Sequence, residues 1–257
     1  MKKTVIALAV ASAMATPAFA ASFVNGGFES GNTTGWTTAG SFYRAGYDNT
    51  TLTTALVLGS GSVDTHSAIV GTSYVDPNVG AALGSTVYSG NSAYRVEDTT
   101  FGGYASVISQ SVSGYTDANI FFAWKAVLLG AHGVNDAATM KISLRDDTSG
   151  TVLITRTYNA ASGGSGVDPR FSLLNNNFYT PAWQIEQLAI DASLSGHDFT
   201  LSVLASDCQP TGHWGYVYLD GFGARIPDPT NVPEPASLAL LGLGLAGLAA
   251  SRRRKNI

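Results

Sequence analysis

Few side chains in this 257-residue sequence have the types and spacing that catalysis or metal binding requires. The four histidines are scattered, and they form neither an H-x-x-x-H pair nor a Cys/His zinc spacing. The segment DCQPTGHWGY could hold a cysteine–histidine pair, but no third member of a catalytic constellation is recognisable. We therefore expect no catalytic residues and no enzymatic activity. The histidines are His66, His132, His197 and His213.

Other catalytic patterns are also missing from the sequence. It contains no G-x-S-x-G, and SGGSGVD reads as a flexible loop because no helix follows it to form a phosphate cradle. Asp146 and Asp147 fall in a predicted turn. A pair of carboxylates that hydrolyses glycosides is still an open alternative, because the distance between two such groups is a three-dimensional property. An enzyme would show convergent polar residues with a perturbed carboxylate or histidine.

Cys208 is the single cysteine, so no internal disulfide can form. In an exported protein an unpaired cysteine is a free thiol or an intermolecular partner. Burial as a small apolar residue is the reading we favour. The fold must then be stable through burial alone, which about 205 residues can achieve.

The first twenty residues have the features of a secretory signal peptide. Lys2 and Lys3 precede an apolar stretch, and Ala18-Phe19-Ala20 matches an A-x-A cleavage site. The apolar stretch is too short to span a membrane. We predict cleavage after Ala20.

The last residues form a second targeting segment. Residues 236–250 are uncharged and rich in Leu, Ala and Gly. As a helix they would reach only ~22 Å, short of the ~30 Å hydrocarbon core. The basic cluster that follows would stay in the cytoplasm. We expect a transient transmembrane anchor rather than a permanent one. The cluster is Arg252, Arg253, Arg254 and Lys255.

This tail resembles the PEP-CTERM sorting signal. The resemblance rests on Pro233, Glu234 and Pro235, followed by the Gly/Leu-rich segment and the arginines. It implies recognition by an exosortase, a membrane protease-transpeptidase, and removal of the tail near Pro-Glu-Pro. The protein would then reach the surface or extracellular polysaccharide of a Gram-negative bacterium. We divide the chain into a signal peptide (1–20), a body (21–226), a linker (227–231) and a sorting signal (232–257).

The body is acidic. It contains eight basic and sixteen acidic residues, a net charge of −8. An acidic surface without a Lys/Arg cluster argues against nucleic acid and anionic lipid as partners.

Short β-rich runs broken by turn residues recur through the body, which predicts an all-β sandwich or barrel. NIFFAWKAVLL is a candidate central strand, and MKISLRDDTSGTVLITRTY is a candidate hairpin. NSAYRVEDTTFGGYASVISQSV predicts two strands, and residues 183–226 predict three. Val57–Ser89 and Asn159–Thr180 have little pattern and are interpreted as insertions.

Five segments of the body resemble sugar-binding modules with a galactose-binding-like jelly roll. They are NGGFESGNTTGW, NSAYRVE, ISQSV, LSGHDFTLSVLAS and GYVYLDGFGARI. The resemblance implies a β-sandwich jelly roll whose first and last strands lie side by side. It also implies a structural calcium ion held there by Glu29 and Asp220 with backbone carbonyls. The alternative to a calcium site is that Glu29 and Asp220 are exposed carboxylates or cap backbone N–H groups.

Aromatic residues are the candidate sugar-binding surface. Trp36, Trp124 and Trp214 are expected in the core. Trp183, Phe178 and Tyr179 follow the Asn-rich stretch and form the one candidate platform for stacking sugar rings.

Three functions fit these features. The leading one is a non-catalytic carbohydrate-binding surface or matrix protein, as the resemblance implies. The second is a structural or adhesive matrix protein without sugar binding. The third is a polysaccharide-modifying enzyme.

Overall fold

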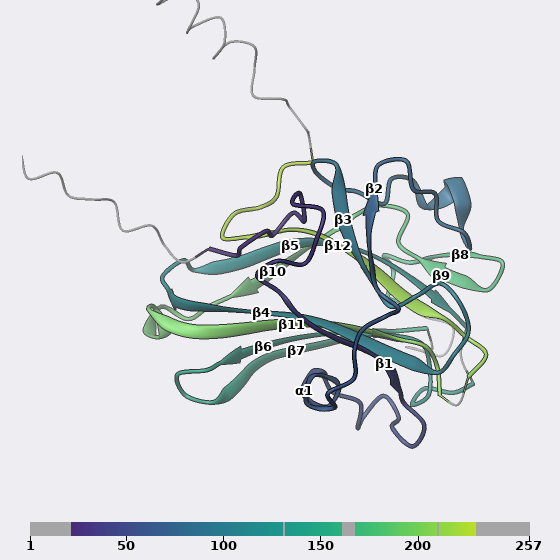
Figure 1. Ribbon diagram of the computed structural model, residues 1–257, viewed down its shortest axis with the longest axis horizontal. Coiled ribbons are helices and arrows are strands. Elements are labelled where there is room, and N and C mark those ends of the chain that lie inside the picture. The colour runs from purple at the N-terminus through teal and green to yellow at the C-terminus, as the bar shows by residue number, and fades with distance from the viewer. Residues whose placement is uncertain (1–21, 131, 161–167, 210, 230–257) are drawn as a thin grey trace, which may run out of the picture.

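The computed structural model describes residues 22–130, 132–160, 168–209 and 211–229, which fold into two stacked antiparallel sheets (Figure 1). The predicted signal peptide and sorting signal lie outside these residues, as does the predicted transmembrane segment 236–250. Among the described residues, no helix is long and apolar enough to cross a membrane.

The first sheet has five strands, and each pairs antiparallel with its neighbours. In spatial order they are β1 (Thr37–Tyr43), β4 (Tyr104–Tyr115), β11 (His197–Ser206), β6 (Thr139–Asp146) and β7 (Thr151–Asn159). Strands β6 and β7 form the predicted hairpin, closed by a turn over residues 147–150.

The second sheet is built around β5 (Asn119–Leu129), the strand that the NIFFAWKAVLL run predicts. One edge of β5 pairs with β12, which is followed by β3 and β2. The other edge is shared, because β10 pairs along its first half and β9 at its end, with β8 beyond β9. These strands are β12 (Gly215–Gly223), β3 (Ser92–Val96), β2 (Ala68–Gly71), β10 (Gln184–Ala189), β9 (Asn177–Tyr179) and β8 (Ser172–Leu174).

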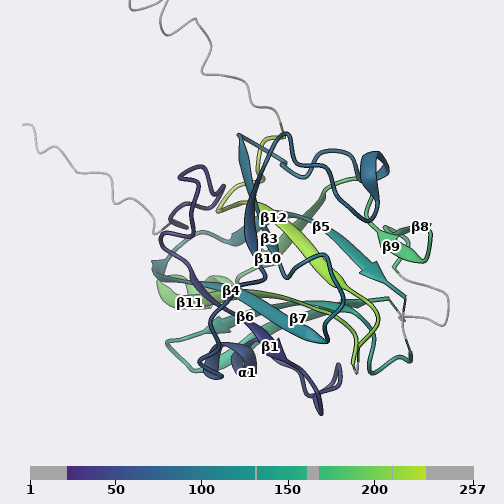
Figure 2. The same cartoon turned by 45° about the vertical axis from the view of Figure 1, so that its right-hand side comes forward.

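Successive strands cross between the two sheets, from β3 to β4 to β5 to β6 and again from β10 to β11 to β12. Seen from a second direction, the two layers remain separate (Figure 2). This alternation is the connectivity of a jelly roll, and the prediction of an all-β sandwich is confirmed.

The core between the sheets follows the two-residue period of the strands. On β4, Ile108 and Val112 point into the core, whereas Val107 lies on the outer face. On β5, Trp124 is fully buried in the same core, and Val127 is buried on the opposite side. A strand buried on both faces is apolar along most of its length, which explains why β5 was recognisable from sequence although it contains the buried Lys125.

Both outer faces carry additional chain segments. Helix α1 (Thr54–Gly59), capped by the Thr53 hydroxyl, covers part of the five-stranded sheet (Figure 1). The 3-10 helix η1 (Gly80–Leu83) covers part of the other sheet through Leu83. The predicted insertion Val57–Ser89 is therefore not patternless, since it contains β2, η1 and the end of α1. The apolar residues of this segment cover the sheets from outside. They belong to short elements, so no long periodic pattern appears in the sequence.

The second predicted insertion, Asn159–Thr180, holds the short hairpin of β8 and β9. Asn175 and Asn176 join these strands with φ angles of 48° and 64°. Asparagine tolerates positive φ well, and two such residues are typical of a type I′ hairpin turn.

The opening of the body differs from expectation. Residues 23–36 form turns rather than a strand, and the first strand, β1, pairs with β4 and not with β12. The physical reason is local, because Asn25 and Phe28 have positive φ angles that interrupt an extended strand. The segment still contacts β12, since the Phe222 N–H donates to the Gly26 carbonyl.

Candidate functional site

Glu29 lies where the opening segment meets the turn before β3. Its carboxylate accepts hydrogen bonds from the N–H groups of Asn91, at 2.8 Å, and Ser92, at 2.9 Å. Glu29 therefore caps this turn, as the capping alternative predicted.

Asp220 lies on β12 and is fully buried. Its Oδ2 atom accepts hydrogen bonds from the N–H groups of Tyr88 and Ser89, both at 2.9 Å. Its Oδ1 atom is buried and has no hydrogen-bond partner among the described residues. Burial raises the pKa of Asp220 to about 7, and the nearby charge of Glu29 adds to that rise. A buried oxygen without a partner is costly unless something absent from the chain binds it.

The two carboxylates line one open cavity of about 600 Å³, together with residues 221–228. Gly27 belongs to the same cavity, and a Cβ there would lie 3.5 Å from Asp220 Oδ1. A hard cation prefers carboxylate and carbonyl oxygens. The donor set and the unpartnered Oδ1 atom fit calcium, which Asp220 and Glu29 would hold.

The predicted aromatic platform is divided between two places. Phe178 packs against the core between the sheets, whereas Tyr179 is buried on the outer face of the second sheet. Trp183 packs on that outer face, and its Nε1–H group donates to the Ser85 carbonyl. The Tyr88 ring lies edge-on to Trp183, and the Lys125 ammonium sits 5.5 Å from the indole centroid. The structure thus brings Trp183 and Tyr179 onto one face and turns Phe178 away.

Of the other tryptophans, Trp36 and Trp124 confirm the expected core positions, whereas Trp214 lies half-buried on the outer face. Trp36 and Trp124 pack in the core between the sheets. Trp214 packs against the outer cluster of the second sheet and stacks on exposed Phe101 with centroids 4.6 Å apart.

A groove lies on the outer face of the five-stranded sheet beside α1, where apolar side chains such as Leu58 and Val152 alternate with hydroxyl and charged ones. A row of hydroxyl side chains crosses adjacent strands beneath it, because the strand register pairs each member with the next. The row consists of Ser109, Ser202, Ser143 and Thr155, of which Ser202 and Ser143 line the groove. Ser109 and Ser202 hydrogen-bond to each other at 2.9 Å.

The next row of the same face adds charge. Thr200 pairs in register with Arg145, whose guanidinium contacts the Asp147 carboxylate at 2.8 Å. The hollow between this row and α1 has a volume of about 290 Å³, and Thr54 and Leu58 form its helical wall. The sequence does not reveal this groove, because Ser and Thr alternating along single strands look like ordinary solvent-facing residues.

Three buried carboxylates have raised pKa values, which is a feature expected of an enzyme. Each of them, however, accepts hydrogen bonds that stabilise the local fold. Burial raises the pKa of Asp207 to about 8, and this carboxylate accepts the N–H groups of Tyr104 and Gly215. Burial also raises the pKa of Glu97, which bonds to His66 and Ser106. Asp220 holds the turn at residues 88–89. The three are therefore assigned structural roles, and the absence of catalysis stays a prediction.

The cysteine–histidine pair of the DCQPTGHWGY segment is formed, and Cys208 is buried as favoured. A third member, His132, joins it from 76 residues away. The sequence does not reveal His132 as a partner, because no local spacing connects it to Cys208.

Several solved structures resemble this chain at low sequence identity. One is a carbohydrate-binding module, CBM61, solved with β-1,4-galactotriose; identity is 12% over 78% of this chain and 95% of that chain, with a TM-score of 0.41. A second is CBM28, a module specific for non-crystalline cellulose, at 13% identity over 77% and 92%, with a TM-score of 0.39. A third is the K1 cleaved adhesin domain of Lys-gingipain from Porphyromonas gingivalis W83, at 12% identity over 77% and 94%, with a TM-score of 0.37.

A comparison with curated protein sequences finds no match. A family model does match the C-terminal residues 231–255, and its description is the PEP-CTERM protein-sorting motif. This range contains Pro233, Glu234 and Pro235 and the arginines predicted to act with them. The motif marks the chain as an exported protein that is sorted by an exosortase.

Proposed function

We propose that this protein is a non-enzymatic component of the surface or extracellular matrix of a Gram-negative bacterium, where its sandwich binds carbohydrate. The sorting motif supports the location, with transient anchoring in the inner membrane before the tail is removed. The observation that carries the binding proposal is the groove beside α1 on the five-stranded sheet, where Ser143, Thr200 and Arg145 offer hydrogen-bonding groups.

The groove suits a neutral polysaccharide. Serine and threonine hydroxyls both donate and accept hydrogen bonds, as sugar hydroxyls do. Arg145 adds donors at the rim, because Asp147 is bound by one of its nitrogens and a guanidinium has five N–H groups. The net charge of −8 on the body would repel polyanions, so an acidic glycan is a poorer candidate.

The test is binding of the purified protein to an array of bacterial and plant polysaccharides, with and without calcium. We expect saturable binding to one neutral class. Ser143→Leu would fill the groove and Arg145→Gln would remove its charged donor, so each variant should weaken binding at least about tenfold. Both side chains face outward on β6, so the core is left intact.

Trp183→Ala is the matched comparison, because it removes the aromatic face predicted from sequence. Loss of binding in the groove variants alone supports the groove. Loss in Trp183→Ala alone would move the site to the Trp183 face of the second sheet. Absence of binding by the unaltered protein would contradict sugar binding and favour a structural or adhesive matrix role.

A further inference from the structure

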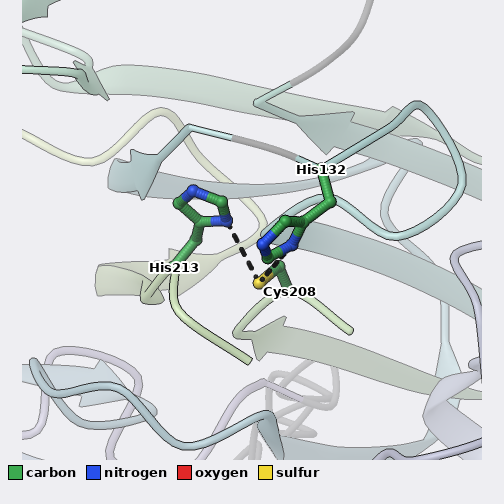
Figure 3. Close-up of side chains that lie close together, drawn as sticks. All are labelled: His132, Cys208 and His213. Atoms are coloured by element: carbon green, nitrogen blue, oxygen red, sulfur yellow. Dashed lines mark hydrogen bonds between the residues drawn. The ribbon is translucent and has the colours of Figure 1, made fainter. Parts of the chain in front are cut away.

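Two loops meet at one end of the sandwich and bring three metal-ligating side chains together. The loop after β5 supplies His132, and the loop between β11 and β12 supplies Cys208 and His213. Figure 3 shows both imidazoles directed at the sulfur, with Nδ1 of His213 at 3.2 Å and Nδ1 of His132 at 3.5 Å from Sγ. The two rings lie 4.4 Å apart between centroids.

The backbone around these side chains is held in place by hydrogen bonds. The Cys208 N–H donates to the His213 carbonyl at 2.9 Å, which closes their loop on itself. The Gln209 N–H donates to the Asp136 carbonyl at 2.7 Å, which ties this loop to the one that carries His132. The cluster is therefore preorganised rather than assembled from free loop tips.

The arrangement leaves a way in for an ion. Cys208 is fully buried, His213 is half-buried and His132 is exposed. Gly130 makes room at the side, because a Cβ there would lie 3.2 Å from the His213 ring. The sulfur thus forms the floor of the site, and the imidazoles form its solvent side.

The distances match the edges of a tetrahedral zinc site. Bonds of ~2.3 Å to sulfur and ~2.0–2.1 Å to nitrogen place the sulfur and a nitrogen ~3.5 Å apart around a tetrahedral ion. The observed separations of 3.2 and 3.5 Å need a shift of only a few tenths of an ångström. A trigonal plane, the geometry of copper sites with two histidines and a cysteine, would need longer edges of ~3.8 Å.

The three ligand atoms lie within 4.8 Å of one another, and the nearby Asp136 carboxylate does not belong to this group. Its Oδ1 atom is buried and has no hydrogen-bond partner among the described residues. Thiolate and imidazole ligands disfavour calcium and magnesium, which prefer oxygen.

We propose that Cys208, His132 and His213 bind one zinc ion, with solvent at the fourth tetrahedral position. Three protein ligands from two loops hold the ion. It fastens the loop after β5 to the loop before β12. Binding displaces the thiol proton of Cys208 and keeps the single cysteine of this exported chain from forming intermolecular disulfides.

Zinc binding by the full chain tests the proposal. The protein is stripped with a chelator and titrated with zinc against a chromophoric competitor, and the bound metal is counted by mass spectrometry. We expect one tightly bound zinc per chain. Cobalt in place of zinc should give a thiolate-to-cobalt charge-transfer band and the intense visible bands of a tetrahedral ion.

The variants separate this site from unspecific binding. His132→Asn changes an exposed side chain and should weaken zinc binding at least about a hundredfold, since even outer-sphere changes cost 10–100-fold. Cys208→Ser should also abolish the cobalt charge-transfer band. His197→Asn is the matched control, because His197 bonds to Asp146 outside the cluster and its loss should leave zinc affinity unchanged.

Three results would overturn the proposal. One is less than stoichiometric zinc in the unaltered protein under reducing conditions. Another is equal zinc affinity in His132→Asn and His197→Asn. The third is a copper complex that zinc at equal concentration fails to displace or prevent, which would assign the site to copper.

Discussion

His66 and Glu97 form an ion pair at the edge of the core. His66 Nδ1 lies 2.5 Å from Glu97 Oε1, and the Glu97 side chain is completely buried. The hydrogen bond to Glu97 is the main reason that the pKa of His66 is raised above its usual value, and burial raises the pKa of Glu97. Both shifts mean that the folded protein binds protons more tightly than the unfolded chain does.

This pair should make stability depend on pH. For a raised histidine pKa, the stabilisation is complete below about pH 6.5 and is lost as the pH rises through the folded-state value. We expect the melting temperature of the protein to exceed that of His66→Gln most at pH 6, with a smaller difference at pH 9. Thermal denaturation of both proteins across this range measures it. A difference that stays constant with pH would show that the pair is not charged in the folded state.

Single residues also show which contacts could not be predicted from the sequence. Cys208 and His213 are five positions apart, so their pairing was visible in the sequence as a possibility. His132 reaches them only because β5 and β11 end at the same end of the sandwich. The unpartnered Oδ1 atoms of Asp136 and Asp220 are likewise products of burial, which no local pattern encodes.

The turn at residues 88–92 joins two elements through carboxylates. Asp220 of β12 accepts its first N–H groups, and Glu29 of the opening segment accepts its last. Calcium bound at this point would hold the opening segment, the turn and β12 together. Because it binds only the folded state, a free concentration of ~100 times Kd would add ~2.7 kcal/mol to the free energy of unfolding.

Chelation should therefore lower the melting temperature by ~5–10 °C for a domain of this size, and calcium alone should restore it. Asp220→Asn should abolish the response to calcium. Asp117→Asn, in the turn between β4 and β5, is the charge-matched control and should keep it. Restoration by calcium in Asp220→Asn, or no shift on chelation in the unaltered protein, would contradict this calcium site.

Strands were predictable where apolar residues follow a regular pattern along the sequence. The apolar run of β5 and the alternation of β4, β6 and β7 gave strands that the structure confirms. The six-residue helix α1 could not be predicted, because it is shorter than two turns and is stabilised by packing of Val57 on the sheet. The opening segment was misjudged as a strand, because its turns depend on the positive φ angles of Asn25 and Phe28.

The whole molecule combines a rigid sandwich with an export route. The described chain leaves the sandwich beside the cavity lined by Glu29 and Asp220, where the Tyr88 hydroxyl donates to the Pro227 carbonyl at 3.1 Å. The sorting motif begins four residues later, at position 231. A cut near Pro-Glu-Pro would thus release the sandwich with only a short tail and leave both proposed metal sites and the groove intact.

The export route makes its own prediction. Replacing Pro233, Glu234 and Pro235 with alanine should remove recognition by the exosortase while leaving the apolar segment 236–250 in place. That segment would then keep the protein in the inner membrane, although at ~22 Å it is a marginal span. Fractionation of the producing cells and an intact-mass measurement of the C-terminus distinguish an uncleaved, membrane-bound chain from a released one. Thr230→Ala, just before the matched range, is the control that should be released normally. Normal cleavage and release of the triple alanine variant would show that Pro-Glu-Pro is not what the protease reads.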